Sequence, residues 1–119
     1  MKFSYLTKNF EIFIFDFDGV ILDSVDIKNK FFRKFFLEYG VEIGNLAYNH
    51  HIKNLGISRY DKIDFVYNNF IKKKLDKNTK KKILENFSNK IIESIQMADF
   101  ISGVKNLLIN LKKNNKKCF

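Results

Sequence analysis

The sequence predicts an α/β protein whose parallel sheet is incomplete within this chain, so that most of the 119 residues are helical. Two observations carry this prediction. A short apolar run at residues 10–15 ends in Asp16-Phe17-Asp18-Gly19, which indicates a strand followed by a tight turn. Most of the remaining chain shows apolar residues at helical intervals. A single parallel strand cannot satisfy its own backbone groups, so the sheet needs further strands.

The apolar run at residues 10–15 is rich in aromatic and β-branched side chains, which favours a short central strand that is buried on both faces. Carboxylates inside such a strand would carry a large desolvation cost. We therefore expect Asp16 and Asp18 at its carboxyl-terminal tip. In open α/β sheets this tip is where ligands bind.

Periodic apolar residues predict four helices in the middle of the chain and one near its end. Ser24 is the expected N-cap of the first helix, whose phenylalanine stripe (Phe31, Phe32, Phe35 and Phe36) is expected in the core. On the third helix we expect Tyr60, Ile63 and Val66 on the apolar face. The predicted ranges are 24–40, 45–54, 58–71, 78–96 and a helix that follows Ser102-Gly103. Lys117-Cys118-Phe119 is predicted to begin a second strand.

The composition excludes a disordered chain, because 45% of the residues are hydrophobic. Lys and Arg outnumber Asp and Glu by 22 to 13, a net charge of +9 that favours anionic ligands. The lysines cluster at 72–74, at 80–82 and near the end of the chain. A solvated surface is the favoured interpretation of each cluster, and nucleic acid is not an expected partner.

Cysteine usage and hydropathy indicate a cytoplasmic protein. The one cysteine, Cys118, excludes an intramolecular disulfide and a cysteine-rich metal site. The first ten residues lack the pattern of a signal peptide. No stretch has the roughly 18 uninterrupted apolar residues that a membrane span requires, so no membrane association is expected.

The segment Phe15–Ser24, FDFDGVILDS, resembles the first motif of the haloacid dehalogenase-like hydrolases, most of which are Mg²⁺-dependent phosphatases. The layout behind it resembles the branch with a helical cap inserted after this motif, similar to phosphoglycolate phosphatase and β-phosphoglucomutase. The resemblance covers the whole chain. It implies a Rossmannoid core strand and catalytic loop at residues 1–22, a helical cap at 23–97, and a return to the core at 98–119.

By this resemblance Asp16 is the nucleophile that forms an aspartyl-phosphate and ligates Mg²⁺. Asp18 is the general acid and base, with its backbone carbonyl on the metal, and the substrate is a small phosphorylated metabolite. The turn at Gly19 would let both carboxylates approach one phosphate, and free backbone N–H groups of the loop would hold its oxygens. Gly19 is therefore a candidate for substrate contact. The alternative is that both aspartates only cap the turn between strand and helix.

Other candidate residues carry weaker signals. Asp23 would either fix the hinge between core and cap or lie in solvent. The cap residues His50, His51, Ser58 and Arg59 are candidates for substrate contacts. A surface or partly buried histidine is the favoured explanation of His50 and His51, and a surface ion pair explains Arg59 equally well. Adjacent histidines on a helix point about a hundred degrees apart, so they do not form a two-histidine metal site.

The family's later motifs, which supply a Ser or Thr, a phosphate-binding cation and further acidic metal ligands, have no counterpart before Phe119. The sequence is therefore expected to be the N-terminal part of a phosphatase, with little activity alone. Two alternatives remain open. In the first, the chain is a basic helical interaction module that binds an acidic partner. In the second, it is one half of a split phosphatase and associates with the missing core remainder.

Overall fold

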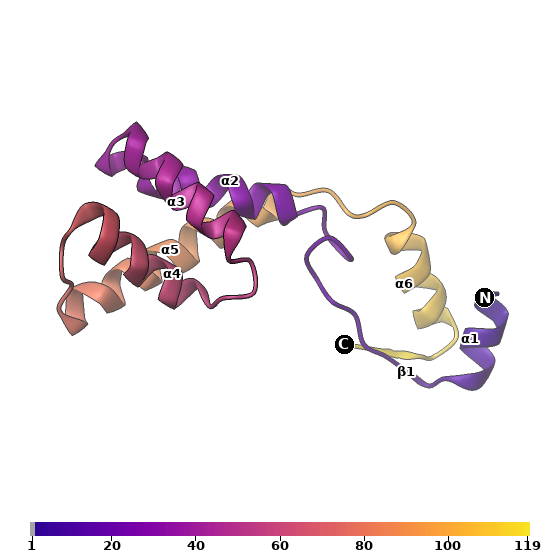
Figure 1. Ribbon diagram of the computed structural model, residues 1–119. Helices are drawn as coiled ribbons and strands as arrows, with labels where there is room; N and C mark the ends of the chain where they lie inside the picture. Colours follow the sequence, from indigo (N-terminus) through magenta and orange to yellow (C-terminus); the bar gives the residue numbers. More distant parts are fainter. Residues whose placement is uncertain (1) are drawn as a thin grey trace. The chain divides into compact units, whose positions relative to one another are not determined.

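The computed structural model describes residues 2–119. The chain forms two compact units: the first comprises the chain up to Val25 together with Ala98–Phe119, and the second is Asp26–Met97. Six α-helices and a two-stranded parallel sheet account for most of the described residues (Figure 1). Their bounds are α1 Phe3–Asn9, β1 Ile12–Phe13, α2 Val25–Phe36, α3 Val41–Lys53, α4 Arg59–Val66, α5 Lys77–Gln96, α6 Val104–Lys113 and β2 Lys117–Cys118.

The first unit is built around the parallel pairing of β1 with β2. Ile12 lies opposite Lys117 and Phe13 opposite Cys118. The Phe15 N–H also donates to the Phe119 carbonyl at 2.8 Å, which continues the ladder beyond the two short strands. The expected second strand at the end of the chain is therefore confirmed.

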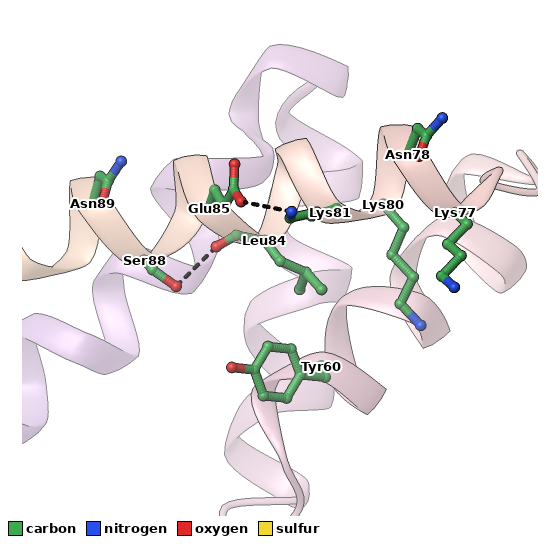
Figure 2. A pocket seen from close by; sticks show the side chains of 9 residues that line it. All are labelled: Tyr60, Lys77, Asn78, Lys80, Lys81, Leu84, Glu85, Ser88 and Asn89. Carbon is green, nitrogen blue, oxygen red and sulfur yellow. Dashed lines mark hydrogen bonds and ion pairs between the residues drawn. The ribbon is translucent and has the colours of Figure 1, made fainter.

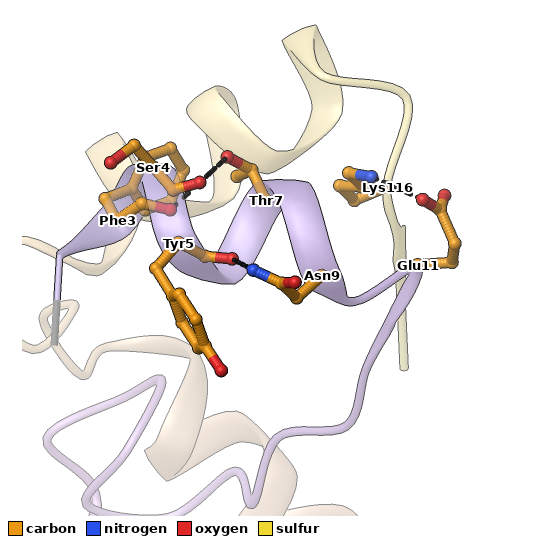
Figure 3. Close-up of polar contacts among 7 residues, drawn as sticks. All are labelled: Phe3, Ser4, Tyr5, Thr7, Asn9, Glu11 and Lys116. Atoms are coloured by element: carbon orange, nitrogen blue, oxygen red, sulfur yellow. Dashed lines mark hydrogen bonds and ion pairs between the residues drawn. The ribbon is translucent and has the colours of Figure 1, made fainter.

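Helix α6 leads into β2 and buries Val104 and Leu111. A side-chain contact also ties the two strand starts together, because Lys116 Nζ lies 2.7 Å from Glu11 Oε1 (Figure 3). Figure 3 also shows α1, in which Thr7 and Asn9 donate to backbone carbonyls of the same helix. These helical hydrogen bonds stabilise a segment that the sequence did not predict to be helical.

The prediction of a buried central strand over residues 10–15 is wrong for this chain. Strand β1 spans Ile12–Phe13 alone, and the side chains around it are open to solvent: Ile12 is 56% exposed and Ile14 is 82% exposed. The physical reason is the width of the sheet. Among residues 2–119 β1 pairs with one strand, β2, and a sheet of two short strands is too narrow to support packed layers on both faces.

The second unit is a helical bundle with an aromatic core. The predicted phenylalanine stripe of α2 is confirmed, since all four of its members are buried. Phe87 of α5 lies edge-on against three of them, with ring centroids 5.0 Å from Phe31, 5.2 Å from Phe32 and 4.8 Å from Phe35. The remaining buried members of this core are Ala47, Ile63, Val66, Tyr67 and Ile91.

Two helix starts in the second unit follow the capping rules on which the predictions rested. Ser58 Oγ accepts from the Tyr60 N–H at 3.1 Å and caps α4, and Asp76 accepts from the N–H groups of Asn78 and Thr79, at 3.0 Å each, and caps α5. Helix α3, however, begins at Val41 instead of at residue 45. Its N-cap is Gly40, which has a φ of 108°.

Between these helices lie two shorter helical segments, a 3₁₀-helix at Leu37–Tyr39 and a π-helical turn at Tyr67–Ile71 that extends α4. The hydroxyl groups of Tyr39 and Tyr67 lie 2.8 Å apart, so the two segments are joined by a hydrogen bond. Within residues 2–119, no helix is both long and apolar enough to cross a membrane.

Candidate active site

The loop that follows β1 carries both predicted catalytic aspartates. Its shape is set by backbone hydrogen bonds: the Phe17 carbonyl accepts from the N–H groups of Ile21 at 2.8 Å and Leu22 at 3.1 Å, and Gly19 N–H donates to the Leu22 carbonyl at 2.7 Å. The loop therefore folds back on itself between Phe17 and Leu22. Asp16 lies just before this turn and Asp18 within it.

Gly19 has a structural reason to be glycine. Its φ of +72° lies in the left-handed region, and a Cβ built there would come within 3.0 Å of Val25 Cγ2. The sequence predicted that Gly19 contacts the substrate. Its N–H is engaged with Leu22, so its visible role is to form the turn that carries the aspartates.

The returning segment, residues 99–101, is hydrogen-bonded to the end of the aspartate loop. Asp23 N–H donates to the Asp99 carbonyl at 2.8 Å, and Ile101 N–H donates to the Ile21 carbonyl at 3.0 Å. An antiparallel bridge between Leu22 and Phe100 lies between these bonds. Within the first unit, the chain that leads into the helical insertion is thus joined to the chain that returns from it, and Asp23 contributes through its backbone.

The carboxylate of Asp18 is held by Ser24. The Ser24 side chain is completely buried, and its Oγ donates to Asp18 Oδ1 at 2.6 Å. This length is typical of a hydroxyl bonded to an ionised carboxylate, which is stronger than a hydrogen bond between neutral groups. Ser24 was predicted as a helix cap. It lies directly before α2, and the hydrogen bond that its side chain donates to Asp18 is a contact that the sequence did not reveal.

Asp16 is exposed, and its Oδ1 accepts from the neighbouring Phe17 N–H at 2.7 Å. Because of this bond the Phe17 N–H is not free, although free N–H groups of the loop were expected to hold phosphate oxygens. The amides of Phe17, Gly19, Val20, Ile21 and Leu22 all donate within the loop, so the expectation is wrong for these five. The tight turn needs these donors for its own closure.

The donor atoms of the loop suit a hard cation. Mg²⁺ prefers oxygen ligands, and the residues predicted to hold it are the Asp16 carboxylate and the Asp18 backbone carbonyl. Both belong to the same loop. Within residues 2–119 no cluster of three or more His, Cys, Asp or Glu side chains lies close enough to hold a metal ion. The loop thus fits Mg²⁺ by the chemistry of its oxygen atoms and could supply part of a coordination shell.

The structure brings two of the predicted cap residues together. His51 of α3 and Arg59 of α4 line one pocket of the second unit, whereas Ser58 is used as the cap of α4. His50 points elsewhere and stacks on Phe65, with ring centroids 3.9 Å apart. The two adjacent histidines therefore have different surroundings, as their helical spacing predicted.

Lys62 was missed by the sequence prediction, although it lies in the same pocket as His51 and Arg59. It is only 3% exposed, while Tyr60, which was expected on the buried face of this helix, is 47% exposed. The spacing of residues along the helix could have indicated the burial of Lys62. Lys62 lies one residue before the buried Ile63 and four before the buried Val66, so it shares their face of α4.

The short parallel sheet, the paired aspartates at the end of β1 and the helical segment behind them define an α/β protein with an acidic site at a strand end. The chain matches haloacid dehalogenase-like hydrolases over residues 13–119. It belongs to this family, and the family match supports a hydrolase. Comparison with curated proteins and with solved structures gives no match.

Proposed function

We propose that this chain carries the nucleophile and the general acid of a Mg²⁺-dependent hydrolase of phosphate monoesters. The observation that supports this most is the pairing of an exposed Asp16 with an Asp18 whose carboxylate is oriented by the buried Ser24. Two carboxylates with different surroundings on one loop suit two different chemical roles. Simple capping of the turn would need only one of them.

In the first step, a carboxylate oxygen of Asp16 attacks the phosphorus atom and the bond between phosphorus and the ester oxygen breaks. Asp18, protonated at that stage, gives its proton to the departing oxygen, which leaves as an alcohol. The phosphoryl group is then held as an aspartyl-phosphate on Asp16. Its exposure makes Asp16 accessible to a phosphate ester.

In the second step, Asp18 is a carboxylate and accepts a proton from a water molecule as that water attacks the phosphorus atom. The bond to Asp16 breaks, inorganic phosphate leaves, and Asp18 is again protonated. The Ser24 hydroxyl keeps the Asp18 carboxylate within the loop during the ionised phase, because it donates to Oδ1. Bound Mg²⁺ would reduce the repulsion between the anionic phosphate and the Asp16 carboxylate.

The second unit, Asp26–Met97, is proposed as the helical cap of this enzyme, in the branch that resembles phosphoglycolate phosphatase and β-phosphoglucomutase. The insertion of this unit directly behind the aspartate loop supports the proposal. The substrate is then a small phosphorylated metabolite, and the net charge of +9 favours such an anion. The single exposed cysteine, Cys118, suits the reducing cytosol, where we place the protein.

Full activity is proposed to require further strands and ligands beside those of residues 2–119. The exposed apolar side chains of Ile12 and Ile14 and the single partner strand of β1 support the addition of a core remainder to this sheet. Such an addition would cover apolar surface and satisfy the second edge of β1.

The test is phosphoryl transfer to Asp16, measured by mass spectrometry after incubation with acetyl phosphate and Mg²⁺, together with hydrolysis of p-nitrophenyl phosphate. We expect one phosphoryl group on a peptide that contains Asp16, and its loss in Asp16→Asn. Asp18→Asn should slow any turnover while it preserves the fold. The matched control is Asp61→Asn, which removes an exposed carboxylate of the second unit and should change neither result.

Phosphorylation that persists in Asp16→Asn, or turnover that is equal in all variants, would contradict the proposed roles. Comparable activity in the unmodified chain and in Asp18→Asn would likewise remove Asp18 as the acid and base. The covalent product is measured separately from turnover. A chain that is phosphorylated but does not turn over would support the nucleophile and the need for a core remainder.

A further inference from the structure

The strongest concentration of charge in the chain lies around the start of α5. Residues 72–82, which we call the lysine segment, contain seven lysines and one aspartate. The segment therefore has a net charge of +6, two thirds of the net charge of +9 of the whole chain. Six of its lysines are exposed, Lys80 is half-buried, and the whole segment belongs to the second unit.

Internal counter-ions are too few to balance this charge. Lys81 lies 3.9 Å from Glu85, and Lys80 pairs with Asp64. The other five lysines of the segment form no ion pair with any of residues 2–119. The carboxylate of Asp76 is already engaged as the N-cap of α5. The segment therefore carries positive charge that the described residues do not neutralise.

The position of this charge is unfavourable for the helix. The N-terminus of an α-helix carries a partial positive charge, so cations destabilise it and anions stabilise it. The first turn of α5 contains Lys77 and Lys80 and no acidic residue. Lys77 and Lys81 are also four residues apart, a spacing at which like charges repel. A bound anion would relieve both effects.

A groove of about 650 Å³ lies beside the lysine segment, between α4 and α5. Lys77, Lys80 and Lys81 line it together with Leu84 and with Tyr60 of α4. Figure 2 shows Lys77, Lys80 and Leu84 extending from α5 toward the side on which Tyr60 lies. The groove thus has cations on one wall and an aromatic ring on the other.

Tyr60 is more exposed than its place in the sequence predicts. It was expected on the apolar face of α4, but it is 47% exposed. The guanidinium of Arg59 lies over its ring, 5.2 Å from the centre, and much of the residue is nevertheless open to solvent. Exposed aromatic rings beside cations are the usual means of binding single-stranded nucleic acids, because bases stack on the rings while phosphates meet the cations.

Three classes of acidic partner match the charge alone: a nucleic acid, an acidic protein segment and an anionic membrane. Membrane surfaces are bound by basic residues together with large apolar side chains that insert, and between Phe65 and Ile92 no large apolar side chain is exposed. The carboxylates of an acidic protein segment would use the lysines and leave the ring of Tyr60 uncovered. A nucleic acid uses both walls of the groove.

We propose that the lysine segment and Tyr60 bind single-stranded nucleic acid, with phosphate groups against Lys77 and Lys81 and a base stacked on Tyr60. The lysines at 72–74 add to the attraction of the strand. By sequence alone a solvated surface was the favoured interpretation of these lysine clusters. The groove and the exposed ring of Tyr60 are the observations that change this interpretation.

The experiment is a titration of a fluorescently labelled oligouridine of about 12 nucleotides with the full chain, followed by anisotropy. EDTA is present, so the measurement is independent of the Mg²⁺ chemistry proposed for the aspartate loop. We expect the logarithm of the affinity to fall with the logarithm of the salt concentration with a slope of about −1.4 or steeper, since each neutralised phosphate of a single strand contributes roughly −0.7. No binding at low salt would overturn the proposal.

Paired charge variants locate the site. Lys77→Gln combined with Lys81→Gln should weaken binding fivefold or more. The matched control is Lys112→Gln combined with Lys113→Gln, which removes two exposed lysines from the end of α6 and lowers the net charge equally. We expect the control to change the affinity less than twofold. Equal weakening in both double variants would show that only net charge matters, and would overturn the location.

The role of the ring has its own test. Tyr60→Ala removes the stacking surface and should weaken binding fivefold or more, whereas Tyr60→Phe keeps the ring and should stay within twofold. Circular dichroism first establishes that each variant is folded, and the exposed lysine variants keep the test decisive if Tyr60→Ala is not. Unchanged affinity in folded Tyr60→Ala would refute base stacking.

Competition distinguishes nucleic acid from the other acidic partners. Poly-glutamate and vesicles of phosphatidylserine with phosphatidylcholine are added to the complex with labelled oligouridine. We expect each to displace it at least tenfold less effectively, per unit of negative charge, than unlabelled oligouridine does. Displacement by either competitor that equals displacement by oligouridine would assign the surface to that class of partner and overturn the proposal.

Discussion

The aromatic core of the second unit leads to a quantitative prediction for Phe87→Ala. Phe87 is 1% exposed and lies edge-on against Phe31, Phe32 and Phe35 at centroid distances of 4.8–5.2 Å. Its removal deletes the α5 ring that lies against all three. The surrounding helices cannot collapse fully into the space, so a cavity remains.

The expected loss in the free energy of unfolding is about 4 kcal/mol, since buried Phe→Ala substitutions cost roughly 3–5 kcal/mol. The upper half of this range applies because each edge-to-face pair adds about 0.5–1.5 kcal/mol beyond buried area. A domain of ordinary stability has about 5–15 kcal/mol in total. Phe87→Ala should therefore remove a large part of the stability of this unit, and Phe87→Leu a smaller part.

The assay is urea unfolding followed by near-ultraviolet circular dichroism and tyrosine fluorescence, because the chain has no tryptophan and Tyr67 is buried in the same core. The matched control is Phe10→Ala, at a side chain that is 48% exposed, which should cost less than about 1 kcal/mol. A loss below about 1.5 kcal/mol for Phe87→Ala, with an unchanged m value, would refute the packing described.

Three further predictions concern the aspartate loop and the Lys62 pocket. Ser24→Ala removes the hydrogen bond to Asp18 and should lower the free energy of unfolding by about 1.5–3 kcal/mol, measured by urea unfolding; no change would show that the bond is not stabilising. Gly19→Ala places a Cβ at a φ of +72° and should cost about 1–3 kcal/mol in the same assay, whereas an unchanged midpoint would contradict the turn. The pKa of His51 is lowered from 6.5 to about 4 by burial and by Lys62, so an unfolded chain binds this proton at higher pH than the folded chain does. The contribution of neutral His51 to the free energy of unfolding should therefore be fully present above pH 6.5 and should decrease as the pH falls toward 4. An NMR titration of His51 with a midpoint near pH 6.5 would contradict this.

Local patterns predicted much of the second unit correctly. The helical spacing of Phe31, Phe32, Phe35 and Phe36 placed the core face of α2. The predicted helix starts at residues 58 and 78 each lie within one residue of the observed first residues of α4 and α5. These features depend on residues within one or two helical turns of each other. The family motif likewise lies within ten consecutive residues.

Features that depend on distant residues were predicted poorly. The exposure of Ile14 follows from the width of the sheet, and the bond between Ser24 and Asp18 follows from the exact path of the loop. The burial of Lys62 requires helices α2, α3 and α5 around it, and a lysine in an amphipathic helix is normally placed on the polar face.

The sequence by itself determined the family of this chain, the position of its two aspartates after a strand, and the order of its helices, because each depends on short-range patterns. Only the tertiary structure decided how the Asp18 carboxylate is held and that Lys62 and Arg59 share a pocket with His51. Those contacts join residues from separate elements, and their partners are set by tertiary packing.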